Sequence, residues 1–226
     1  MMHAIELGSR RILQPGPWRW MRALVWAVII ALMALAGGLL PAVAIFLVAG
    51  AVTGIAITDL QSVPGTWQFA AMLAWAIGAL ATYAGLVRAG EDRRPSELDL
   101  RAAPAELALG LAIGGAMMAV AVLILAAGGW VKLTPAPVSS AWRWLALAVE
   151  SGPLEELVFR AILLRLLWRA FGPWAALAIS AAVFGAGHIL NPNATWFAAV
   201  CIMIEAGIML AGFYILTGRL WMSIMF

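Results

Sequence analysis

The chain has 226 residues, of which 65% are hydrophobic and only 11% are charged. Because a soluble domain usually carries about a quarter charged residues, this chain cannot cover a globular surface with polar side chains. A soluble enzyme and a disordered chain are therefore excluded, and we expect one integral membrane domain over residues 1–226. The net charge of +3 could suggest a nucleic-acid partner. The arginines lie mostly beside apolar runs, however, where membrane topology explains them better.

Six apolar runs are long enough to cross a membrane, since a helical span needs about 20 residues. They cover Ala23–Ile57, Gln68–Val87, Ala105–Gly128, Ala141–Trp168, Pro173–Leu190 and Thr195–Leu216. A seventh run begins at Leu220 and is cut off by the chain end at Phe226. The sequence thus predicts an all-α, polytopic membrane helix bundle with about six complete spans and the start of a seventh. In the third run, Gly110 and Gly114 form a small-xxx-small pattern that predicts close helix packing.

The first run is ambiguous, because a helix of its length would measure about 52 Å against an apolar membrane core of about 30 Å. A single crossing places eleven of the fourteen basic residues on one side, with Lys132 and Arg143 opposite and Arg160 inside a span. Two crossings would move the second arginine cluster to the wrong side. We therefore expect one crossing, kinked near residues 37–41, in a multi-pass protein of the bacterial cytoplasmic membrane. Its basic N-terminal segment, residues 1–22, is then cytoplasmic.

The connector between the second and third runs, residues 88–101, mixes four arginines with four carboxylates. Interspersed charges of both signs are typical of a solvated surface. We expect a solvated cytoplasmic connector with a short surface helix after Pro95, and we attach no chemistry to it.

Ionisable residues inside a span are costly and indicate function. The fourth run contains Glu155, Glu156 and Arg160, and Glu155 lies about ten residues, or about 15 Å, from Arg165 at the cytoplasmic end. Glu156 and Arg160 are four residues apart, so they share a helix face and can pair. Glu155 points about 100° away and stays available as a general base that takes a proton from water. The alternative is a buried polar clamp that ties helices together.

The fifth run contributes His188, the only histidine within a span, with Phe184 one turn earlier on the same face. His188 lies about 22 Å from Pro173 along the helix, and a modest tilt would bring it level with Glu155. The alternative is an interfacial histidine next to the loop at residues 191–193. Beside a pair of glutamates on the adjacent helix, the functional interpretation is favoured.

Other polar residues give weaker signals. Glu150 could line the same cavity as Glu155, and Glu205 in the middle of the sixth run should point inward, since a carboxylate facing lipid is costly. Glu155, Glu156 and His188 could supply three ligands for a divalent metal such as zinc. No His-Glu-x-x-His pair is present, so the usual zincin arrangement is absent and our leading expectation is that no cofactor is required.

The pattern Glu155-Glu156-x-x-x-Arg160, followed on the next span by Phe184-x-x-x-His188, resembles the CPBP family of CAAX proteases and bacteriocin-processing enzymes, also called the ABI family. The resemblance covers residues 148–226, a catalytic core that includes the sequence Thr-Gly-Arg-Leu-Trp at 217–221. It implies a multi-pass intramembrane endopeptidase. Glu155 matches the catalytic glutamate and His188 its partner in activating water, while Glu156 and Arg160 match the rest of the first motif. The family has been described both as metalloproteases and as metal-free glutamate proteases, and the lack of a zincin motif favours the second description.

The family also has a third motif, a histidine followed four positions later by asparagine or a similar residue, which is thought to help hold the oxyanion. The chain ends at Phe226, about where that histidine would stand. The stub at 220–226 would be only about 10 Å long, too short to cross the membrane. We therefore expect the sequence to be truncated before the third motif and to have doubtful activity as it stands.

Three functions are compatible with this sequence. The leading hypothesis is an intramembrane endopeptidase that acts on a membrane-associated peptide or protein, with Glu155 and His188 activating the attacking water. A catalytically silent membrane scaffold or bacteriocin-immunity protein is the alternative, motivated by the missing third motif. A proton-coupled transporter is third, because such proteins often show internal repeats and none is found here. The oligomeric state stays open.

Overall fold

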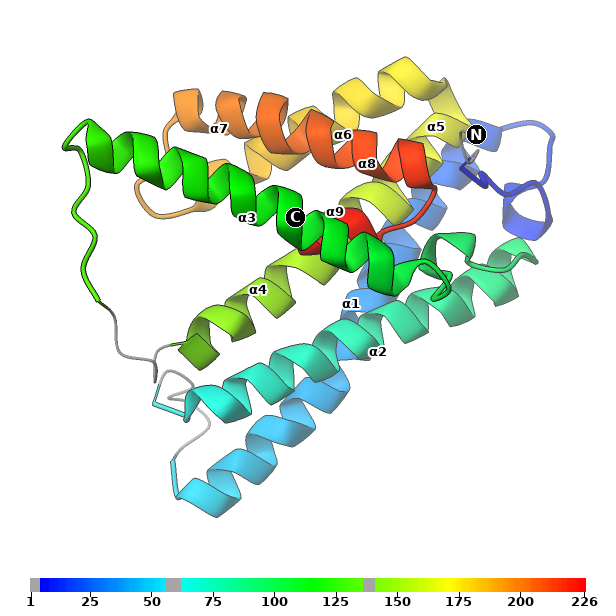
Figure 1. Ribbon diagram of the computed structural model, residues 1–226. Helices are drawn as coiled ribbons and strands as arrows, with labels where there is room; N and C mark the ends of the chain where they lie inside the picture. Colours follow the sequence, from blue (N-terminus) through cyan, green and yellow to red (C-terminus); the bar gives the residue numbers. More distant parts are fainter. Residues whose placement is uncertain (1–4, 56–61, 136–140) are drawn as a thin grey trace.

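The computed structural model describes residues 5–55, 62–135 and 141–226, and within these ranges the chain is mainly helical and contains no strand (Figure 1). The α-helices are α1 (Arg19–Thr53), α2 (Gly65–Glu91), α3 (Ala103–Ala127), α4 (Ala141–Glu156), α5 (Arg165–Phe171), α6 (Pro173–Gly187), α7 (Trp196–Ile202), α8 (Met209–Thr217) and α9 (Trp221–Met225). Short 3-10 helices occur at Arg11–Leu13, Ser96–Leu98 and His188–Leu190. The prediction of an all-α helix bundle is confirmed.

Two π-helices join shorter α-helices into continuous rods. The π-helix η4 (Leu157–Leu164) connects α4 to α5, and η6 (Met203–Ile208) connects α7 to α8. The rods therefore extend from 141 to 171 and from 196 to 217, close to the fourth and sixth predicted runs. Their apolar pattern does not reveal the π-helices, which are rare and often occur at functional sites.

Among the described residues, five helical segments are long and apolar enough to cross a membrane: Arg19–Thr53, Gly65–Glu91, Ala103–Ala127, Pro173–Leu190 and Trp196–Thr217. They coincide with five of the six predicted runs and indicate an integral membrane protein. The rod 141–171 is helical too but is not among the five, and it is the rod that carries the charged first motif. The first run forms a single helix to Thr53, while its predicted end at Ile57 lies outside the described residues.

Helices α1 and α2 form a long antiparallel pair at one side of the bundle (Figure 1). Gly38 allows their close approach, because a Cβ there would lie 2.3 Å from the Trp75 carbonyl oxygen. Helix α4 packs on α2, α5 on α1 and α6, and α6 on η6. Buried apolar side chains of these elements form a core cluster, which positions the charged rod 141–171 between the α1–α2 pair and α6.

Helix α3 crosses the bundle outside this core and packs mainly on the short α9 (Figure 1). A Cβ on Gly110 would lie 2.3 Å from the Met222 carbonyl oxygen, and one on Gly114 would lie 2.2 Å from that of Phe226. The predicted close packing at this small-xxx-small pattern is thus confirmed.

The expectation that residues 88–101 are a solvated connector is wrong, because three of their charged side chains are buried. Glu91 and Glu97 are 0% and 2% exposed, and the Arg93 side chain is 4% exposed. Glu91 accepts hydrogen bonds from both terminal nitrogens of Arg165, at 2.7 and 2.8 Å. Arg93 donates two hydrogen bonds of 2.8 Å to Glu97 and one of 2.7 Å to Glu91. Two carboxylates and two guanidinium groups therefore form one buried network.

Neutral side chains complete this network. The Trp26 indole donates to Glu91 at 2.9 Å, and the Tyr83 hydroxyl donates to Glu97. Buried charges persist only when they are paired and hydrogen-bonded, and this network satisfies that condition. Arg165, placed by the sequence at the cytoplasmic end of the fourth run, is 0% exposed within this network. The short helix expected after Pro95 is present at Ser96–Leu98.

The segment 217–221 ties the end of the second rod to the same connector. The Leu220 backbone N–H donates to the Glu97 carbonyl oxygen at 3.1 Å, and the Trp221 indole N–H donates to the Asp99 carbonyl oxygen at 2.9 Å. The Leu-Trp pair of the sequence motif therefore holds the C-terminal part of the bundle against the α2–α3 connector.

Candidate active site

The charged first motif lies where α4 passes into the π-helix η4. Glu155 is half-buried, whereas Glu156 and Arg160 are 2% and 1% exposed. Gly152, one turn earlier, lets α9 approach closely, because a Cβ there would lie 2.7 Å from the Ile224 carbonyl oxygen. The motif is therefore enclosed by packed helices, with Glu155 its most accessible charged group.

Glu156 and Arg160 form the ion pair that their spacing predicts, with Arg160 Nη1 3.0 Å from Glu156 Oε1. The other terminal nitrogen of Arg160 donates to the Ala206 carbonyl oxygen of η6 at 3.1 Å. The guanidinium carbon also lies 4.5 Å from the centre of the Phe184 ring on α6, within the range of a cation–π contact. Arg160 thus neutralises one carboxylate and connects three elements around the motif.

His188 lies at the end of α6 with its ring orientation fixed by the backbone. Its Nδ1 is 2.8 Å from the Phe184 carbonyl oxygen. A carbonyl oxygen only accepts hydrogen bonds, so Nδ1 carries a proton, and in the neutral imidazole Nε2 offers a lone pair. The ring centre lies 4.7 Å from that of Phe184, which in turn packs edge-on against Phe159 at 4.9 Å. The Phe-x-x-x-His spacing therefore places the imidazole against Phe184, which in turn contacts the charged rod.

Glu155 lies within electrostatic range of His188, Arg160 and Glu150. The fold thus brings together a half-buried carboxylate from the first rod and an oriented imidazole from α6. Such a pair can share the two hydrogens of one water molecule, with the carboxylate acting as base. Glu156 is held by Arg160 and does not compete for this role.

Polar atoms beside this pair still have hydrogen-bonding capacity. Among the described residues, no hydrogen-bond partner is found for Glu156 Oε2 or for Arg160 Nε. Ser223 of α9 lies next to Glu156, and its hydroxyl donates to the Leu220 carbonyl oxygen at 3.0 Å. The sequence did not indicate Ser223 or the Ala206 carbonyl, because neither contact follows from helical spacing.

The three side chains named as ligands for a divalent metal do not fit such a site. Within residues 5–55, 62–135 and 141–226, no group of three His, Cys, Asp or Glu side chains is arranged to hold a metal ion. Glu156 is turned toward Arg160, which leaves Glu155 and His188 as the only two of the three that could face one ion. We derive no step of the chemistry through a metal.

Glu205 and Glu150, the two other acids singled out in the sequence, lie in different environments. Glu205 is exposed, so the expectation that it points inward is wrong. The π-helix η6 packs on α6 through Gly207, whose Cβ would lie 3.1 Å from Ala181, and Glu205 lies on another face. Glu150 lines a cavity of about 280 Å³ together with Arg143 and residues of α1 and α2. This cavity adjoins the helix turn that precedes the first motif.

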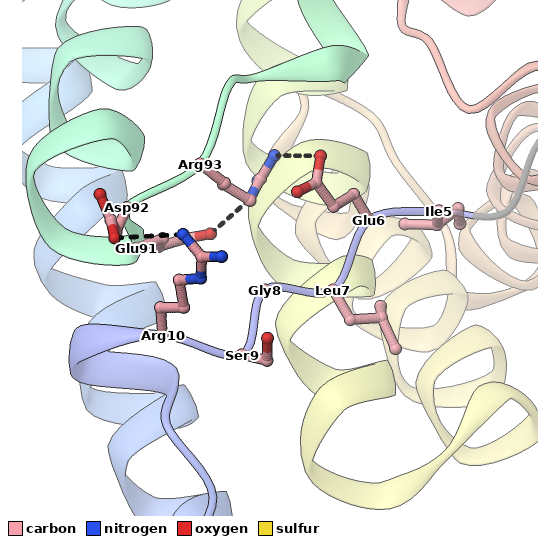
Figure 2. A pocket seen from close by; sticks show the side chains of 9 residues that line it. All are labelled: Ile5, Glu6, Leu7, Gly8, Ser9, Arg10, Glu91, Asp92 and Arg93. Carbon is pink, nitrogen blue, oxygen red and sulfur yellow. Dashed lines mark hydrogen bonds and ion pairs between the residues drawn. The ribbon is translucent and has the colours of Figure 1, made fainter.

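A larger cavity of about 590 Å³ lies at the other end of the rod, beside the buried network (Figure 2). It is bounded by the N-terminal segment 5–10 and by residues 91–93. Figure 2 shows Arg93 between Glu91 and Glu6, and Arg10 facing Asp92. Glu91 binds Arg165, ten residues beyond Glu155 on the rod, so this cavity is separate from the Glu155–His188 pair.

Comparison with known protein families gives a match over the C-terminal part of the chain. Residues 137–226 match the family model of type II CAAX prenyl endopeptidases, Rce1-like. The resemblance inferred from the motifs is confirmed over this segment. The Rce1-like segment contains Glu155, Glu156, Arg160 and His188, and it spans both π-helices and α9. No curated protein and no solved structure matches the chain.

Proposed function

We propose that the protein is an intramembrane endopeptidase that hydrolyses a peptide bond of a membrane-associated peptide or protein. The single observation that carries the proposal is the position of half-buried Glu155 within electrostatic range of the oriented imidazole of His188, between apolar helices. The match of residues 137–226 to a family of prenyl endopeptidases supports peptide-bond hydrolysis as the reaction class.

In the proposed reaction, a water molecule donates one hydrogen bond to Glu155 and the other to His188 Nε2. Glu155 takes a proton as the water oxygen attacks the carbonyl carbon, and that proton then passes to the amide nitrogen as the carbon–nitrogen bond breaks. The elements of water are thus added across the peptide bond, and both side chains return to their starting state. Surrounding apolar helices limit bulk water, which strengthens the electrostatic interactions at the site.

Arg160 and Phe184 act as positioning residues in this proposal. Arg160 neutralises Glu156, so that Glu155 is the carboxylate available to water. Phe184 accepts the hydrogen bond from His188 through its backbone carbonyl and lies under the guanidinium of Arg160. We further propose that the reaction needs no metal ion, and we expect the rate to survive incubation with a chelator.

The proposal is tested by cleavage of a membrane-anchored peptide by the purified protein in detergent. Removal of a general base or its partner typically lowers rates by about 10²- to 10⁴-fold, and we expect such losses for Glu155→Gln and His188→Ala. Glu205→Gln is the matched control, because it removes an exposed carboxylate in a span, and it should keep the wild-type rate. Wild-type rates for both site variants would show that the mechanism is wrong.

A further inference from the structure

A third concave site also lies at the network end of the bundle and has no part in the proposed chemistry. It is a groove of about 740 Å³ between α2, the connector 94–101 and the start of α9. Arg88, Arg94 and Arg101 line it together with apolar side chains of α2 and the Trp221 indole.

The groove carries unneutralised positive charge. Arg88, Arg94 and Arg101 are exposed, and none forms an ion pair with a residue that the structure describes. The one acid in the lining is Asp99, whose carboxylate accepts the Arg101 backbone N–H at 3.1 Å. The neighbouring Arg93, in contrast, is neutralised by Glu91 and Glu97. Because three arginines line the groove with a single carboxylate, the groove carries a net positive charge that favours an anionic ligand.

The lining also changes from charged to apolar along α2. Leu80, Ala84 and Arg88 line the groove and follow one another at intervals of four residues on one helix face. Leu80 therefore lies about 12 Å from Arg88, toward the middle of the span. A ligand that fits both ends has an anionic head at the arginines and an apolar tail along α2.

The wall opposite α2 is held in place by hydrogen bonds. Trp221 donates to the Asp99 carbonyl oxygen, and Leu220 donates to that of Glu97. Tryptophan indoles are enriched at the level of lipid headgroups, where the ring is apolar and the N–H is polar. The groove is thus a preformed surface at the membrane boundary.

We propose that this groove binds an anionic phospholipid, with its phosphate at Arg88, Arg94 and Arg101 and an acyl chain along Leu80 and Ala84. The charge complementarity selects an anion, and the apolar α2 face distinguishes a lipid from a soluble phosphate. The site is independent of the proposed peptidase activity, since it lies beside the α2–α3 connector rather than at Glu155.

The test is native mass spectrometry of the full chain in detergent, titrated with phosphatidylglycerol or with phosphatidylcholine of the same acyl chains. Each arginine near an anionic lipid surface contributes about a fivefold factor in affinity. Arg94→Gln with Arg101→Gln should therefore weaken phosphatidylglycerol binding by about 25-fold. The matched control, Arg10→Gln with Arg19→Gln, removes two charges outside the groove and should leave affinity within about twofold.

A third variant tests the apolar part of the groove. Ala81 is exposed and lines the groove, so Ala81→Trp fills it without changing the charge and should also weaken phosphatidylglycerol binding. Inorganic phosphate should not compete at equal concentration. The proposal would be overturned if the two double-arginine variants lost phosphatidylglycerol affinity equally, or if the two lipids bound equally well. Full competition by phosphate, or unchanged binding by Ala81→Trp, would also overturn it.

Discussion

The Glu97 carboxylate is subject to two opposing effects. Burial alone raises its pKa, but the hydrogen bond from Arg93 and the positive charges of Arg165 and Arg93 lower it more. The net result is a pKa below the ordinary value of 4.5. The pKa of the Arg93 guanidinium shifts in the opposite direction. Burial lowers this pKa, but the contacts with Glu97 raise it by more, so the net shift is upward. Both groups are therefore held in their charged forms.

This depressed pKa predicts how stability depends on pH. Ionised Glu97 stabilises the fold above about pH 4.5, and the contribution is lost as the pH falls through the lower, folded-state pKa. Glu97→Gln should destabilise the fold at pH 7 by about 3–5 kcal/mol, because it leaves buried arginine charge less well paired. The unfolding free energy of this variant should then change less than that of the wild type between pH 5 and about pH 3.

The measurement is equilibrium unfolding in mixed micelles across this pH range. Asp92→Asn is the matched control, because the ion pairs of Asp92 with Arg10 and Arg11 are exposed. This substitution should lower the unfolding free energy by less than about 1 kcal/mol. An equally steep loss of stability on acidification in Glu97→Gln would refute the assignment to Glu97.

Helical spacing was a sound guide to contacts within one rod and a poor one to contacts between rods. Glu156 and Arg160 pair as four-residue spacing predicts. Glu91 and Arg165 are 74 residues apart, so no local pattern could reveal that a charged connector is buried. Glu205 was misjudged for a related reason, because the sequence gives the depth of a residue in a span but not the face it occupies.

At the scale of elements, the packing of α3 on α9 depends on glycine. A Cβ on Gly110 would lie 2.3 Å from the Met222 carbonyl oxygen, and backbone atoms cannot yield to it as a flexible side chain could. The approximate extent of the helices and a close approach at these glycines follow from the sequence, because apolar runs and small-xxx-small spacing are local signals, but the partner α9 does not. The π-helices η4 and η6 do not, because a π-turn shifts the hydrogen-bond pattern without changing the apolar composition.

A pair of glycine variants tests this contact. Gly110→Ala should destabilise the protein by about 1–3 kcal/mol, because the added methyl forces α3 and α9 apart. Gly115→Ala, on the same helix with nothing within 4 Å of its would-be Cβ, should be neutral or mildly stabilising. Thermal unfolding of the two variants in one detergent gives the comparison, and similar melting temperatures would show that the close approach does not matter.

At the scale of the whole molecule, the connections rich in arginine lie at one end of the helices and those poor in basic residues at the other. The N-terminal segment, the α2–α3 connector and the α5–α6 turn lie at one end of the bundle, and the loop after α3 lies at the other (Figure 1). We propose that the arginine-rich end is cytoplasmic, following the positive-inside rule. Some of these arginines belong to the buried network, so Arg93 and Arg165 contribute to folding rather than to surface charge.

Cysteine labelling tests this orientation. In a Cys201→Ser background, Ser9→Cys should react with a membrane-impermeant maleimide only after the cytoplasmic face is exposed in inverted vesicles. Lys132→Cys, at the other end of the bundle, should react in intact cells. The opposite pattern would reverse the orientation, and reaction of both positions from one side would contradict the single crossing of α1.

The measurement that tests the central claim most directly is a double-mutant cycle on cleavage of the membrane-anchored peptide. If Glu155 and His188 act on one water molecule, removing either one removes the shared function, and their effects are strongly non-additive. We predict that Glu155→Gln, His188→Ala and the double variant have single-turnover rates within about tenfold of one another, all far below the wild type. Rate losses that multiply in the double variant would show that the two residues act independently and would contradict the account.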